Sequence, residues 1–89
     1  MHIALREIRM SVRQSLLAIL AQGPCYGYQL RSEFERRTGS SSALNVGQIY
    51  STLERLERDG LVSRGAADEA GHVYWQITDA GRGEARAWL

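Results

Sequence analysis

The sequence is poor in the residues that cross-link or anchor a small protein. It contains one cysteine, Cys25, and one proline, so it can form neither an intramolecular disulfide nor a zinc site built from several cysteines. A single cysteine suits a reducing compartment, and we expect a cytoplasmic protein. The longest apolar run, residues 16–21, is far shorter than the roughly 18 residues of a membrane span, and no charged-then-apolar leader opens the sequence. We therefore expect a chain that is neither exported nor membrane-spanning.

Lysine is absent, so all 11 basic residues are arginines, and ten acidic residues leave a net charge of +1. The sequence pI near 8.0 is lower than the value above about 9 that is usual for a nucleic-acid-binding domain. Overall charge therefore neither supports nor excludes DNA binding, and the positions of the arginines must decide. The length fits one domain, residues 1–89, whose core is small enough to favour self-association.

No arrangement of residues suits catalysis. His2 and His72 have no nucleophile or metal-ligating partner at a recognisable spacing, and no glycine-rich phosphate loop is present. The carboxylates alternate with arginines at helical spacings that suit surface ion pairs. We expect no enzyme, no cofactor and no metal.

Three helices are predicted before residue 60. The first carries an apolar face from residue 12 to 20 and stops at Gly23-Pro24. The second runs from about residue 27 to 37. Tyr26 is spaced four and eight residues before Leu30 and Phe34, which places it among the packed residues. The third spans residues 45–59, has an apolar stripe on one side and ends at Gly60. Residues 1–10 either extend the first helix or form a separate arm, and the pattern leaves both open.

A β-hairpin and a last helix complete the pattern. Residues 61–64 form a short strand, residues 65–71 a polar turn, and residues 72–77 a second strand with Trp75 on its inward face. Thr78 caps the final helix. The expected fold is mainly α with a small β-hairpin (α+β), a winged helix-turn-helix of order α-α-α-β-β-α.

Three stretches resemble the PadR family of bacterial transcription regulators. Residues 23–28, Gly-Pro-Cys-Tyr-Gly-Tyr, are similar to the family's Gly-Pro-x-His/Tyr-Gly-Tyr. Residues 46–62 look like its recognition helix and first wing strand, and residues 74–81 resemble its Tyr-Tyr-x-Leu-Thr-x-x-Gly wing exit. The resemblance spans nearly the whole chain and implies a homodimer that binds an operator, usually represses, and often responds to a small aromatic or drug-like effector.

The polar side of the third helix is the candidate reading face. Gln48, Ser51, Thr52 and Arg55 share it by their i, i+3, i+4, i+7 spacing, and Asn45 lies at its start. Such side chains can pair with base edges or phosphates of double-stranded DNA. A merely solvated helix face is the alternative reading of the same pattern.

Backbone contacts are expected from two tyrosines and from the wing. Tyr28 lies at the start of the second helix, where free N–H groups favour a phosphate. Tyr50 lies beside the reading face, and the resemblance implies that it reaches the DNA backbone, with a tyrosine packed on the domain surface as the alternative. The resembling proteins carry Arg or Lys before the tyrosine pair of the wing, whereas this chain has residues 71–73, Gly-His-Val. Arg64 is therefore the main wing candidate, with His72 second, because the turn between them is acidic.

Dimer contacts are expected from both ends of the chain. Leu5 and Ile8 are candidates in the first segment, and Trp88 is either an interface residue or a frayed surface aromatic. About three helical turns follow Thr78. Two explanations stay open, a short-form member of the family and a truncated chain. The rival to DNA binding is a winged helix that binds protein, which the near-neutral charge and acidic turn keep open.

Overall fold

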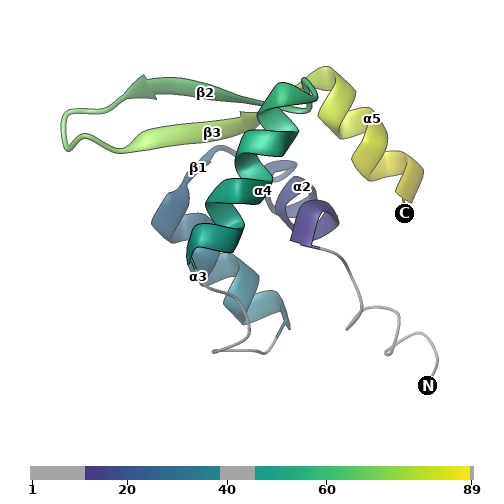
Figure 1. Cartoon of the computed structure of the whole chain (residues 1–89), viewed down its shortest axis with the longest axis horizontal. Coiled ribbons are helices and arrows are strands. Elements are labelled where there is room, and N and C mark those ends of the chain that lie inside the picture. Colours follow the sequence, from purple (N-terminus) through teal and green to yellow (C-terminus); the bar gives the residue numbers. More distant parts are fainter. Residues whose placement is uncertain (1–11, 39–45, 89) are drawn as a thin grey trace.

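Four helices and a three-stranded sheet make up residues 12–38 and 46–88, the part of the chain that the computed structural model describes (Figure 1). The helices are α2 (Val12–Leu20), α3 (Gly27–Thr38), α4 (Val46–Arg58) and α5 (Asp79–Trp88). The strands are β1 (Cys25–Tyr26), β2 (Val62–Ala67) and β3 (Val73–Ile77). The winged-helix fold predicted from the sequence is thereby confirmed, with one strand more than expected.

Both ends of the wing are fixed by local chemistry that the sequence predicted. Gly60, with a φ of +78°, ends α4, and the amides of Gly60 and Leu61 donate to the carbonyls of Glu57 and Leu56 at 3.0 and 2.9 Å. This pair of bonds is the Schellman arrangement, which glycine favours because it adopts positive φ without strain. At the other end the Thr78 hydroxyl accepts from the Gly81 amide at 3.0 Å and so caps α5.

The core lies where the helices meet the base of the sheet. Leucines of α2 and α3 pack against the predicted stripe of α4, and Trp75 on β3 closes the core with 4% of its surface exposed. The buried apolar residues are Leu16, Leu17, Ile19, Leu20, Leu30, Phe34, Ile49, Leu53, Leu56, Leu61, Val62 and Trp75. Burial of this one cluster fixes how α4 is rotated about its axis.

The sheet differs from the predicted hairpin in two ways. The strand β1 pairs antiparallel with β3, so the order is β1-β3-β2, and Tyr26 lies in this strand rather than beside Leu30 and Phe34. The first wing strand reaches Ala67, and the turn is shorter than expected. The register between β2 and β3 shifts between Arg64 and Ala67, where the period-two pattern breaks. The wing therefore projects further from the helices than the sequence indicated (Figure 1).

Of the helices that the structure describes, none is both long enough and apolar enough to cross a bilayer.

Candidate nucleic-acid interface

Three of the four predicted reading residues on α4 face solvent. Gln48, Ser51 and Arg55 are exposed. Thr52 is the exception, because 6% of its surface is exposed and its hydroxyl donates to the Gln48 carbonyl at 2.8 Å. The placement of Thr52 on the reading face is therefore wrong. A small hydroxyl can be buried in a helix by donating to the carbonyl four residues back, and its hydrogen is then not available to a base.

The buried stripe shows where the outward side of α4 is centred. Ile49, Leu53 and Leu56 are fully buried, and each residue turns the helix by about 100°. The row opposite this stripe is exposed along its whole length and consists of Gly47, Ser51, Glu54 and Arg58. We call these four residues the outward row.

Sequence reasoning placed the reading face too close to the core and missed three members of the outward row. Gly47, Glu54 and Arg58 were not among the candidates, although the same apolar stripe, followed to its opposite side, points to them. Gln48 and Arg55 flank the row on one side, and Tyr50 flanks it on the other. The outward row and these three neighbours together form the exposed face of α4.

Tyr50 reaches across to the first turn of α3. A methyl group on Gly27 would lie 1.9 Å from the Tyr50 hydroxyl oxygen, so only glycine leaves room for this ring. Tyr50 is 42% exposed, and Tyr28, the next residue after Gly27, is 70% exposed. The Gly-Tyr pair of the sequence thus places two phenols beside the free N–H groups at the start of α3, where an anion is stabilised.

A cleft of about 450 Å³ separates these tyrosines from the wing. Tyr28 and Tyr50 line one part of it, and Glu54, Arg64 and His72 are among its other lining residues. The cleft therefore joins α3, α4 and the sheet, and it brings together five residues that lie far apart in the sequence.

Arg64 is held within the fold. Its guanidinium donates to the Glu57 carboxylate at 2.8 and 3.2 Å and lies over the Trp75 ring, 4.7 Å from the centroid. The hydrogen-bonded pair raises the pKa of Arg64 and lowers the pKa of Glu57. Arg64 was expected to be an available cation for phosphate, but Glu57 already balances its charge. A phosphate would have to compete with this carboxylate.

His72 is also engaged on the protein side. Its ring stacks on Tyr26 with centroids 4.1 Å apart, and its Nδ1 lies 3.5 Å from an oxygen of Asp68. Asp68 accepts from the backbone amides of His72 and Ala70 at 2.9 Å each, and these bonds lower its pKa. Asp68 therefore shapes the wing turn and keeps it negatively charged, which disfavours phosphate there.

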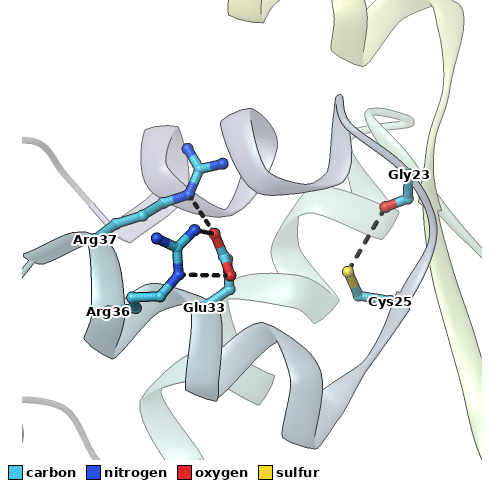
Figure 2. A network of polar contacts seen from close by, with 5 residues as sticks. All are labelled: Gly23, Cys25, Glu33, Arg36 and Arg37. Carbon is cyan, nitrogen blue, oxygen red and sulfur yellow. Dashed lines mark hydrogen bonds and ion pairs between the residues drawn. The ribbon is translucent and has the colours of Figure 1, made fainter.

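The cations of α3 are paired with carboxylates, as Figure 2 shows for Arg36 and Arg37, whereas two cations of α4 are not. Arg36 and Arg37 both turn toward the carboxylate of Glu33, with Arg37 Nε at 3.0 Å, and these bonds lower the pKa of Glu33. Within the described residues, Arg55 and Arg58 form no ion pair. Arg55 and Arg58 are therefore available on α4 for a phosphate or a guanine.

Cys25 lies near this network but has no sign of reactivity (Figure 2). Its half-buried thiol donates to the Gly23 carbonyl at 3.6 Å, and burial, followed by the charge of Glu33, raises its pKa. A raised pKa suppresses the thiolate, which is the reactive form. No group of three or more metal-ligating residues occurs among the residues described.

Four candidates lie wholly or partly outside the described residues. Asn45, Leu5 and Ile8 lie outside the described residues, and so does the side chain of Trp88, although its backbone belongs to α5. Their assignment to DNA or to a dimer interface stays a prediction.

Comparison with known proteins gives a consistent result. A family model described as "Transcriptional regulator PadR-like family" matches residues 16–87. The curated protein "Negative transcriptional regulator PadR" of Bacillus subtilis (strain 168) is 25% identical over 81 residues, which cover 88% of this chain and 44% of that protein. The chain thus spans less than half the length of this relative.

Solved structures resemble the fold closely. A transcriptional regulator from Clostridium thermocellum superposes with a TM-score of 0.77 at 25% identity, over 86% of this chain and 75% of that one. Bacillus subtilis PadR in complex with operator DNA superposes with a TM-score of 0.75 at 25% identity, over 86% of this chain and 45% of that one.

Proposed function

This chain belongs to the PadR-like family of transcriptional regulators, and on that premise we propose that it binds double-stranded DNA as a repressor with α4 in the major groove. The family consists of regulators and not of enzymes. The observation that carries the proposal is the exposed face of α4, where Gln48, Ser51 and Arg55 lie beside cations that no acid neutralises. Such side chains are the ones that pair with base edges. The similar fold of Bacillus subtilis PadR was solved with operator DNA, which supports the same use here.

Backbone contacts fix the position of the helix in this proposal. Tyr28 and Tyr50 donate to phosphates on one side of the groove, next to the first turn of α3. The wing contributes less to DNA affinity, because Arg64 is already paired with Glu57 and the turn is acidic. Most of the affinity then comes from α3 and α4.

A salt series tests DNA binding directly. Fluorescence anisotropy with the DNA upstream of the gene should give a log–log slope of affinity against salt of about −0.9 for each phosphate contact. Arg55→Ala should weaken binding by roughly 5- to 150-fold, the discrimination expected of one arginine–guanine pair. Arg36→Ala is the matched control, since it removes the same charge where Glu33 already balances it. Equal losses in the two variants would contradict the role of Arg55.

The proposal includes a homodimer on a palindromic operator. Two α4 helices would enter successive major grooves, with half-sites about 34 Å apart. Leu5, Ile8 and Trp88 are the proposed contacts between the two copies. Light scattering after gel filtration should give twice the monomer mass, and a full palindrome should bind far more tightly than one half-site. A monomer that binds both DNAs equally would contradict the dimer.

A small aromatic effector has a candidate place between α2 and α5. A cleft of about 380 Å³ lies there, within the usual size of small-molecule sites, and apolar side chains of Leu17, Ala18 and Ala85 line it. An aromatic dye such as anilinonaphthalene sulfonate should bind the protein, and Ala18→Trp, which fills the cleft, should abolish binding without unfolding. Undiminished dye binding by a folded variant would contradict this site.

The acidic wing turn favours a second candidate function, the recognition of a basic protein partner. Asp68 and Glu69 are exposed at the tip, and Glu57 balances the arginine of the neighbouring strand. The salt series separates the two functions, because a protein-binding module would show no affinity for DNA at low salt.

A further inference from the structure

Glu54 occupies the middle of the outward row of α4. It is exposed, with Ser51 one turn before it and Arg58 one turn after it. The recognition helix of homeodomains contacts bases with residues spaced i, i+3, i+4 and i+7, and Gly47, Tyr50, Ser51 and Glu54 have the same spacing. Gly47 adds no side chain at the start of the row, which lets the helix backbone approach its target closely. Glu54 thus lies at the centre of the face that α4 would present to a groove.

The carboxylate of Glu54 forms no hydrogen bond and no ion pair with any residue that the structure describes, and Arg58 at i+4 is not bonded to it. It acts only at longer range on Arg64, whose pKa is raised mainly by Glu57 and to a lesser extent by the charge of Glu54. Glu57 lies one turn away on the wing side, and both of its carboxylate oxygens accept hydrogen bonds from Arg64. An unpaired acid at the centre of a DNA-binding face repels phosphates and weakens binding to every sequence.

Base chemistry identifies what such a carboxylate can accept. In the major groove the only hydrogen-bond donors are the amino groups of cytosine and adenine, and a glutamate accepts from N4 of cytosine. Guanine and thymine present carbonyl oxygens at the corresponding positions, and these repel a carboxylate. Glu54 therefore favours a base with an amino group, cytosine above all, and disfavours guanine and thymine.

Resting on the proposed DNA-binding function, we propose that Glu54 is a specificity-determining residue that accepts a hydrogen bond from cytosine in each half-site. Its charge lowers affinity for DNA in general, and the contact with cytosine restores affinity at the correct site. Glu54 thus widens the ratio between specific and non-specific binding, which is the quantity that decides where a regulator acts.

Selection from a random DNA library tests this role. The wild type should enrich cytosine at one position of each half-site. Glu54→Gln should shift that position to adenine, since glutamine pairs with N6 and N7 of adenine, and should leave the other positions unchanged. Glu54→Ala should lose roughly tenfold discrimination at that position and should bind DNA of arbitrary sequence more tightly than the wild type does.

A matched control separates base reading from simple charge. Glu69→Gln removes the same charge from the exposed wing turn, and it should change affinity equally for all sequences while the enriched bases stay the same. Circular dichroism melts establish that each variant is folded. If the Glu54 variants enrich the same bases as the wild type, the inference fails while DNA binding stands. If the wild type binds no DNA, the proposed function fails and the inference fails with it.

Discussion

Replacing Gly81 by alanine should cost the domain a large part of its stability. Gly81 lies in the first turn of α5, and a methyl group there would lie 2.1 Å from the carbonyl oxygen of Leu61. This oxygen belongs to the backbone and already accepts the Thr78 amide at 3.0 Å. The clash therefore cannot be relieved by rotating a side chain. Either α5 or the start of the wing must move by more than an ångström.

The expected loss follows from the size of that movement. Overpacking of a well-packed site costs about 1–3 kcal/mol, and a rigid backbone neighbour places Gly81→Ala at the upper end. A domain of this length has a free energy of unfolding of roughly 4–13 kcal/mol. A loss of about 2–3 kcal/mol should lower Tm by about 8–24 °C.

Gly83 provides a control on the same helix. A methyl group at this position meets nothing within 4 Å, so Gly83→Ala should gain the helix propensity of alanine, about 0.5–1 kcal/mol, and raise Tm. Urea unfolding and thermal melts followed by circular dichroism measure both variants. The reasoning is refuted if Gly81→Ala unfolds within 0.5 kcal/mol (about the error of the method) of the wild type, or if both variants shift in the same direction.

Three further predictions follow from single contacts. Gly27→Ala should leave stability nearly unchanged, because the exposed Tyr50 ring can swing away. Both Gly27→Ala and Tyr50→Phe should lower DNA affinity up to about tenfold in anisotropy titrations. Full affinity in both variants would contradict the phosphate contact. Arg64 lowers the pKa of Glu57, so this ion pair stabilises the fold above the ordinary glutamate pKa of about 4.3, and its contribution disappears as the pH falls through the lower pKa of the folded state. The urea midpoint should therefore fall less on acidification in Glu57→Gln than in the wild type. Identical pH profiles of the two proteins would show that the pair contributes nothing. Thr78→Ala should cost about 1–2 kcal/mol in urea unfolding through the lost cap of α5, whereas Thr78→Ser should retain most of it; an equal loss in the two would exclude the hydroxyl as the cause.

The parts of the fold that the sequence predicted well are those with local causes. The stripe of Ile49, Leu53 and Leu56 and the glycine after α4 lie within one segment, and helix period and cap chemistry suffice to find them. The strand β1 is two residues long and too short for any period. It exists because Cys25 pairs with Trp75, fifty residues away, and such a pairing is visible only once the chain has folded.

The candidate site shows the same division. Helical spacing predicted which residues of α4 share a side, but the exact direction of that side depends on how the helix is rotated against the core. This rotation buries Thr52 and places Glu54 at the centre of the exposed face. The partner of Arg64 could not be predicted either, because the turn at Gly60 brings Glu57 back against β2.

The stacking of Tyr26 on His72 has a consequence for the shape of DNA that the protein accepts. β1 joins the sheet two residues before Tyr28, and the ring contact ties the wing turn to the same strand. The tip of the wing and the start of α3 are thus held at a fixed separation. A protein with such a fixed separation binds a groove whose width already matches it more tightly than a groove that must be deformed. In the proposed complex with DNA, sequence-dependent groove width would then contribute to specificity at base pairs that no side chain touches.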